Sequence, residues 1–281
     1  MKSINIIKSH GEKVPFEFDK LVNSLKRSGA SEEEAQRIAT KITNSLYEGI
    51  HTKEIYKNAY QLLKKNERTY AARYHLKNGI MELGPSGFPF EKYFSEILKF
   101  EGYQVQTDQA IAGYCVNHEI DIIAEKDNCH FLVECKYHSK AGYKCNVKTP
   151  LYIHSRFRDI EKQRLKKSIN ESKMHQAWIV TNTQFSRDAI QYGKCSGMYL
   201  ISWSYPKSKS LKDRIDVAGL YPVTCLTTLT GREKRVLLDQ MIVLCQDICK
   251  DDIVLKRIGI SDSRINKISK EAKALCFGTI T

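Results

Sequence analysis

Apolar residues recur with a helical period through most of the first 84 residues, after a short extended stretch at the start. Residues 4–8 and 13–16 predict a β-hairpin, because Gly11 permits the backbone angles that the turn between them needs. Four helices should follow. The first contains the apolar positions of residues 21–25, and the second begins at the capping box of residues 31–34. The third begins at the cap Thr52, and the fourth runs through residues 71–76.

The periodicity stops at residues 84–89, Gly-Pro-Ser-Gly-Phe-Pro, which indicate a linker and a domain boundary. Beyond a helix at residues 90–98 the pattern changes to extended runs that alternate with helices, which is typical of an α/β domain with a mixed sheet. We therefore expect three parts, residues 1–84, 85–210 and 211–281, the last of them helical. The predicted strands are residues 103–107, 119–124, 131–136, 177–181 and 198–203, and the predicted helices between them are residues 156–169 and 186–193.

Composition adds limits on class and location. Of the 281 residues, 42% are hydrophobic and 27% are charged, which excludes a mostly disordered or collagen-like chain. No apolar run approaches the ~20 residues that cross a bilayer, and residues 1–8 are too short and polar for a signal peptide. The nine cysteines are odd in number, which, with no export signal expected, indicates reduced thiols, and no pair has the C-x2-C spacing of a structural zinc site. We expect a cytoplasmic protein with no membrane partner.

The charge is uneven along the chain. The net charge is +13, which favours a polyanionic partner such as nucleic acid. Residues 85–135 carry 3 basic and 9 acidic groups, and residues 136–173 carry 11 basic and 3 acidic groups. Clustered carboxylates suit a divalent cation, and clustered lysine and arginine suit phosphates. The alternative interpretation is an ordinary solvated helix face.

Residues 118–123 and 131–136 place charged groups inside two strands that otherwise look buried. Strand alternation puts Glu134 and Lys136 on one face and Cys135 on the other, and Asp121 lies on a neighbouring strand. Two carboxylates could hold a hard cation while the lysine orients or deprotonates a water molecule. The simpler alternative is an ion pair between Glu134 and Lys136 on an edge strand.

The Asp121, Glu134 and Lys136 pattern resembles the PD-(D/E)xK nuclease motif, and residues 86–205 resemble the Mrr-type restriction endonuclease domain. The resemblance also rests on Phe90-Glu91, Gly102-Tyr103 and the run from Trp178 to Asn182. The resemblance implies a restriction-endonuclease-like mixed sheet flanked by helices. It implies Asp121 and Glu134 as ligands of Mg²⁺ or Mn²⁺ and Lys136 as the catalytic lysine. Glu91 would be the helix carboxylate of the site, with Glu96 as its competitor. Ile120 stands where the motif has proline.

Residues 1–84 resemble the ATP-cone, a small nucleotide-binding regulatory module. The resemblance rests on residues 6–11, 16–21, 49–55 and 70–74. It implies that Lys8 and Lys20 contact phosphates and that Thr52 lies near a bound ATP or dATP. Ser9 replaces the arginine that is usual after the first lysine. No Walker-type loop occurs, so the nucleotide would be sensed and not hydrolysed. The alternative is a small helical domain with surface lysines.

Together these features predict a Mg²⁺-dependent endonuclease that acts on double-stranded DNA, is regulated by a nucleotide, and works as a homodimer. A second interpretation is a nucleotide-responsive DNA-binding regulator whose nuclease fold is inactive, and a third is a nuclease for RNA or branched DNA. The sequence leaves all three open. In the tail, residues 255–260 and 265–268 weakly suggest two short helices with a glycine turn, as in helix-hairpin-helix DNA binders. We expect instead that the carboxyl-terminal helices form a plain cap on the nuclease domain.

Overall fold

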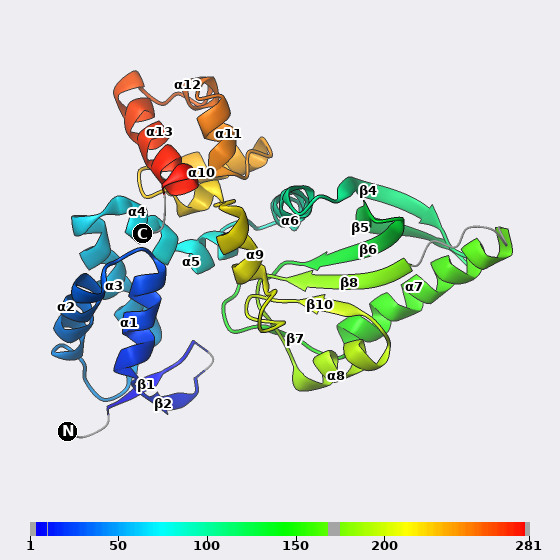
Figure 1. Cartoon of the computed structure of the whole chain (residues 1–281), viewed down its shortest axis with the longest axis horizontal. Coiled ribbons are helices and arrows are strands. Elements are labelled where there is room, and N and C mark those ends of the chain that lie inside the picture. The colour runs from blue at the N-terminus through cyan, green and yellow to red at the C-terminus, as the bar shows by residue number, and fades with distance from the viewer. Residues whose placement is uncertain (1–3, 10, 168–174, 279–281) are drawn as a thin grey trace. The chain divides into compact units, whose positions relative to one another are not determined.

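The computed structural model describes residues 4–9, 11–167 and 175–278. The chain divides into two compact units. Residues 1–82 and 221–281 form one, the helical unit, and residues 83–220 form the other, the sheet unit (Figure 1). The tail beyond residue 220 therefore joins the amino-terminal part, and the expectation that it caps the nuclease domain was wrong.

The amino-terminal part of the helical unit is a three-stranded sheet packed on helices. β1 and β2 form the predicted hairpin, and β3 adds to β1 in parallel, which the sequence pattern did not predict because the strand has two residues. Ser31 caps α2 by accepting the N–H of Glu34, as expected. The N-cap of α3 is His51 and not Thr52, which is the first residue of the helix. The elements are β1 (Asn5–Ile7), β2 (Lys13–Pro15), α1 (Phe18–Arg27), α2 (Glu32–Thr43), β3 (Ile50–His51), α3 (Thr52–Asn66), α4 (Arg68–Tyr74) and α5 (Leu76–Met81).

The tail docks on α4 and α5 through specific polar contacts. Thr224 donates its hydroxyl to the carbonyl of Gly79 at 2.7 Å, and Arg73 donates to the carbonyl of Gly278 at 2.7 Å. A Cβ at Gly79 would come within 2.6 Å of the Cys225 sulfur, so glycine allows this close approach. The tail elements are η1 (Val223–Cys225), α10 (Gly231–Asp239), α11 (Cys245–Lys250), α12 (Ile253–Arg257) and α13 (Asp262–Phe277).

The sheet unit contains a five-stranded mixed sheet in the order β10-β8-β6-β5-β4 (Figure 1). β4, β5 and β6 are antiparallel neighbours, whereas β6, β8 and β10 run parallel. The α/β class and the mixed sheet are thus as predicted. The elements are α6 (Phe88–Phe100), β4 (Gln104–Ala112), β5 (Asn117–Lys126), β6 (Cys129–Lys136), β7 (Lys144–Cys145), α7 (Lys148–Lys167), β8 (His175–Thr181), β9 (Gln184–Phe185), α8 (Arg187–Cys195), β10 (Tyr199–Ile201) and α9 (Leu211–Ala218).

α7 begins eight residues before the predicted start at residue 156. Pro150 suggests a break in the sequence, but it lies in the first turn of the helix, where proline is tolerated because no intrahelical N–H bond is lost. The predicted end of this helix, residues 168 and 169, lies outside the described residues.

Helices cover both faces of the sheet. Side chains of α7 and α8 pack with Ala177 and Ile179 on one face. α9 covers the other face, where Arg214 lies over the Trp178 ring, and α6 packs against α9. Arg214 also pairs with Glu101, so α9 belongs to the sheet unit although a boundary at residue 210 was expected. None of the helices in the described ranges has the length and apolar character needed to cross a membrane.

Candidate active site

Glu134 and Lys136 lie on β6, which is the central strand of the sheet and not an edge. The two side chains are on one face, and Lys136 Nζ donates to Glu134 Oε1 at 2.5 Å. The second oxygen, Glu134 Oε2, accepts from Arg156 of α7 at 2.9 Å. Glu134 is only 6% exposed, so these two cations offset the cost of burying its charge. The ion pair that sequence reasoning offered as the simpler alternative therefore exists, but in the centre of the sheet.

Asp121 lies where β5 and β6 stop pairing. The last residue pair at this end of the ladder is Ile122 with Val133, and the neighbouring residues Asp121 and Glu134 are no longer paired with each other. Beyond this point Asp121 Oδ2 accepts the backbone N–H of Cys135 at 2.7 Å. The carboxylate thus replaces a carbonyl of the ladder as the partner of a backbone donor. This opening between two strands brings Asp121 and the β6 carboxylate to the same place.

Glu91 reaches the same cluster from the first turn of α6. Its pKa is raised to about 7, first by burial and then by the negative charges of Asp121, Asp108 and Glu134. The pKa of Asp121 is raised to about 6, again by burial first and then by Glu134. Burial is therefore the main cause of both raised pKa values, and the further rise from neighbouring carboxylates indicates that these groups lie close together.

The lysine of the cluster is protonated at neutral pH. Burial works to lower the pKa of Lys136, but the charge of Glu134 and the hydrogen bond to it prevail, and the pKa is raised. A protonated lysine can act as a hydrogen-bond donor and as a positive charge, but it cannot accept a proton. Its side chain is 35% exposed, so it can reach a molecule that approaches from solvent.

Of the two candidate helix carboxylates, the structure brings only Glu91 to Asp121. Glu96 lies five residues on and forms ion pairs with Lys92 and Lys99, both at 2.9 Å. These pairs lower the pKa of Glu96 despite its partial burial. The roles of Glu91, Asp121, Glu134 and Lys136 stay predictions, while their convergence is a property of the fold.

Buried polar residues on β8 and just after it fix the end of β6. Thr181 donates its hydroxyl to the carbonyl of Lys136 at 2.7 Å. Asn182, which is 1% exposed, bonds both the N–H and the carbonyl of His138. The backbone that carries Lys136 is thereby held in place, as a precise site requires.

The residues present fit a magnesium ion of the kind bound partly by substrate. In the described ranges, no group of three or more His, Cys, Asp or Glu residues could hold a metal by itself. Mg²⁺ is commonly bound by one or two carboxylates, with water and substrate phosphates completing the shell. Asp121 and Glu134 supply two hard oxygen ligands, provided that Glu134 gives up its bond to Arg156 or Lys136.

Sequence reasoning missed Arg156 and Asp108 as neighbours of the cluster. Arg156 was seen only as one cation of the basic block, because its partner Glu134 is 22 residues away and on another element. Asp108 lies on β4 with a positive φ of 53°. His118 contacts Asp159 at 2.8 Å, so its partner lies outside the cluster. Cys135, on the opposite face of the strand from Glu134, is buried.

Residues 4–77 match the ATP cone domain, residues 84–204 match a family described as restriction endonuclease, and residues 221–276 match the AF1548-like carboxyl-terminal family. An uncharacterized protein of Archaeoglobus fulgidus is 33% identical over 184 residues, which are 64% of this chain and 97% of the relative. This chain belongs to the AF1548-like family.

The AF1548 crystal structure, titled as a protein of unknown function, agrees with this assignment. It is similar with a TM-score of 0.56 and 30% identity, and the match covers 69% of this chain and all of the AF1548 chain. This AF1548-like protein thus combines an ATP-cone, a restriction endonuclease domain and the family's carboxyl-terminal region. The predicted domain types are confirmed.

In the ATP-cone of this AF1548-like protein, two of the three predicted nucleotide contacts lie at adjacent strand ends. β1 pairs with β3 at Ile7 and His51, and Lys8 and Thr52 are the next residues along each strand. Lys8 pairs with Glu12 at 3.0 Å, and Lys20, in α1, pairs with Glu17 at 2.5 Å. All these groups are open to solvent to some degree, so the pairs can be exchanged for phosphate at small cost.

Proposed function

We propose that this AF1548-like protein is a Mg²⁺-dependent endonuclease that hydrolyses phosphodiester bonds of double-stranded DNA and responds to ATP or dATP at its ATP-cone. The observation that carries the proposal is the group of Glu91, Asp121, Glu134 and Lys136 at the opening between β5 and β6. The raised pKa values of Glu91 and Asp121 support it, because a cation there would relieve the repulsion.

Each side chain has a task that its surroundings suit. Asp121 and Glu134 would hold the metal ion, which supplies Lewis-acid polarisation of a phosphate oxygen. Lys136, protonated and partly exposed, donates hydrogen bonds to the attacking water or to the phosphate oxygen on which charge develops. Glu91, with a pKa of about 7, accepts the proton that water loses, since a base is most effective near the working pH.

The basic block after the site supplies phosphate contacts. Lys140, Lys144 and Lys148 are carried between β6 and the start of α7, and Arg158 and Lys162 follow on the helix. Such contacts give affinity without reading the sequence of the bases. A DNA substrate therefore fits the charge distribution of the chain, whose net charge is +13.

The test is a plasmid cleavage assay with the full chain, on modified and unmodified DNA, with Mg²⁺ or Mn²⁺, and with or without ATP and dATP. Wild-type protein should cut. Asp121→Ala and Lys136→Ala should each lose about 100-fold or more in rate. Glu91→Gln should lose activity, whereas Glu96→Gln, on the same helix, should keep it. Cleavage that survives Asp121→Ala and Lys136→Ala would refute the assignment.

Nucleotide control and assembly are tested separately. Lys8→Ala and Lys20→Ala should weaken ATP or dATP binding in calorimetry, while Lys41→Ala, an exposed lysine of α2, should not. Cutting both strands needs two sites, so we propose a homodimer. Light scattering that gives a monomer both with and without ATP would contradict it.

One observation favours a second candidate, a nucleotide-responsive DNA-binding regulator with an inactive nuclease fold. Both oxygens of Glu134 are already bonded, to Lys136 and to Arg156, so the carboxylate has no oxygen left without a cationic partner. For that candidate, DNA would bind with a steep salt dependence and remain uncut in every metal tested.

A further inference from the structure

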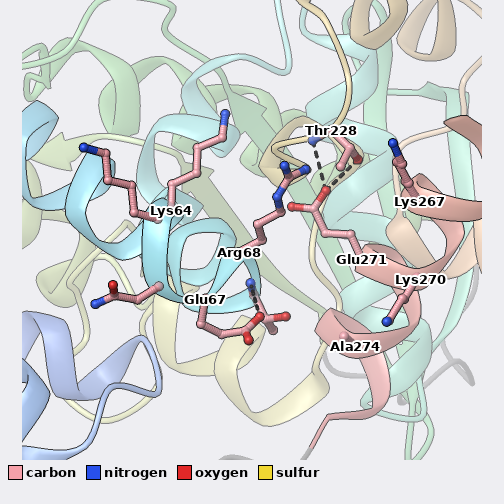
Figure 2. A pocket seen from close by; sticks show the side chains of 11 residues that line it. Lys64, Glu67, Arg68, Thr228, Lys267, Lys270, Glu271 and Ala274 are labelled. Atoms are coloured by element: carbon pink, nitrogen blue, oxygen red, sulfur yellow. Dashed lines mark hydrogen bonds between the residues drawn. The ribbon is translucent and has the colours of Figure 1, made fainter.

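An open groove of about 500 Å³ lies within the helical unit. One wall is formed by the end of α3 and the start of α4, and the other by one face of α13. Figure 2 shows Lys64 and Arg68 on one side of it and Lys267 and Lys270 on the other. Lys267 and Lys270 are three residues apart on α13 and so share a helix face. The basic residues that line the groove are Lys64, Lys65, Arg68, Lys267 and Lys270.

The two acidic residues of the groove are occupied by other partners. Glu271 is 6% exposed and accepts the N–H of Thr227 at 2.9 Å. It also accepts the N–H of Thr228 at 3.0 Å and the Thr228 hydroxyl at 2.6 Å (Figure 2). Glu67 accepts the N–H of Thr69 at 3.1 Å. Glu271 thus holds the loop before α10 against α13, and Glu67 caps α4.

Among the residues that the structure describes, the lysines and the arginine of the groove have no carboxylate partner. Within the described ranges, no ion pair involves Lys64, Lys65, Arg68, Lys267 or Lys270. Lys64 lies 5.9 Å from the centre of the Tyr60 ring, a contact that leaves its charge in place. Like charges that face one another across a groove repel, so an anion bound there is stabilised by all of them.

A second open groove, of about 370 Å³, extends the first. It shares Lys64, Arg68, Thr228 and Lys267 with it and continues to Arg264. Arg264 is held by Glu233 and by the carbonyl of Thr228, so it shapes the wall and is not available to a ligand. The two grooves together form a basic surface longer than a single phosphate needs.

The chemistry of the walls identifies the ligand class. No aromatic ring lines either groove among the described residues, and the lining is mostly charged or small and polar. A nucleotide or a single strand is normally held by stacking of its bases on such rings. Phosphates presented by a backbone, with the bases turned away, need only the cations.

We propose that this groove, built jointly by the ATP-cone and the carboxyl-terminal region, binds the phosphate backbone of double-stranded DNA without sequence preference. The choice of duplex DNA rests on the proposed function, while the basic groove itself does not. The groove belongs to the helical unit and shares no residue with the carboxylate cluster of the sheet unit. It gives the AF1548-like carboxyl-terminal region a role in holding substrate.

The test measures binding of a dye-labelled duplex of mixed sequence to the full chain by fluorescence anisotropy, in EDTA so that nothing is cut, over a series of KCl concentrations. The slope of log K against log[KCl] is negative, and removing one lysine that pairs with a phosphate should make it shallower by about 0.9. The variants are Lys267→Ala, Lys270→Ala and their double. The double should make the slope shallower by about 2, and Lys267→Arg with Lys270→Arg should restore it.

The controls remove the same charge elsewhere. Lys273→Ala lies on α13 and Lys41→Ala on α2, both exposed and outside the groove lining. Thermal unfolding should show the same midpoint for every variant. If the groove variants change the slope no more than these controls do, the proposal is overturned. It is also overturned if the groove variants bind ATP or a single strand more weakly but keep duplex affinity.

These outcomes separate the inference from the proposed function. Duplex binding that depends on Lys267 and Lys270, with no cleavage in any metal, would refute the nuclease and keep the groove. Cleavage that depends on Asp121, together with duplex binding that does not depend on the groove lysines, would support the nuclease and refute the groove.

Discussion

Replacing Asp121 by asparagine should stabilise the metal-free protein at pH 8, although it disables the proposed site. The reason is that Asp121 is held next to Glu134 and Glu91 at the opening between β5 and β6, and its pKa is raised to about 6 from an ordinary value of 3.8. Asparagine keeps an oxygen that can accept the N–H of Cys135 but carries no charge.

The magnitude follows from the pKa. A carboxyl group with a raised pKa holds more protons in the folded than in the unfolded protein between about pH 4 and 6, so the free energy of unfolding falls as the pH rises through this range. A change from 3.8 to about 6 corresponds to about 3 kcal/mol. Because Asp121 is partly exposed, we take about half of this, 1 to 1.5 kcal/mol, as the expected gain of Asp121→Asn at pH 8.

The assay is urea unfolding in EDTA, followed by tryptophan fluorescence. Both tryptophans, Trp178 and Trp203, lie in the sheet unit, so the signal reports on the part of the protein that holds the cluster. The gain should shrink toward zero at pH 4, where the carboxyl group is protonated in the folded state. Adding Mg²⁺ should stabilise the wild type at pH 8 and leave Asp121→Asn unchanged.

Asp127→Asn is the matched control, since Asp127 is exposed in the turn after β5 and asparagine tolerates its positive φ of 50°. It should change stability little at any pH. If Asp121→Asn were less stable than wild type at pH 8, or equally stable at pH 4 and pH 8, the carboxylates would not repel one another and the metal-site reasoning would be wrong.

Other residues give predictions of the same kind. Arg156→Met leaves the buried Glu134 with one cation, so it should lower the free energy of unfolding by about 2 kcal/mol in urea titration, with Arg156→Lys restoring part; an unchanged value would contradict the role of this contact. Glu271→Gln should lower the free energy of unfolding by about 1 to 3 kcal/mol in calorimetry, because the side-chain NH₂ group would face a backbone N–H donor that it cannot accept. An unaltered midpoint of thermal unfolding would count against this role of Glu271. The cleavage rate of wild type should rise from pH 6 to pH 8 as Glu91 loses its proton, and Glu91→Gln should abolish that rise; a rate that peaks at pH 5 would exclude Glu91 as the base.

The sequence determined the local elements and the chemistry of the central strand. Alternation along β6 is enough to place Glu134 and Lys136 on one face and Cys135 in the core, since side chains in a strand alternate by geometry. The hairpin of β1 and β2 and the N-cap Ser31 were predictable for the same reason, because each depends on residues within one turn or one strand.

Only the tertiary structure decided which distant groups meet. Glu91 and Glu96 lie on one predicted helix, and only a family resemblance favoured Glu91. The orientation of α6 turns Glu91 toward Asp121 and leaves Glu96 with Lys92 and Lys99. The contact of Arg156 with Glu134 and the docking of the tail on α5 also depend on packing between elements far apart in the chain. Periodicity specifies which face of an element is buried, whereas the partner of that face is chosen by the shape and charge of all the others.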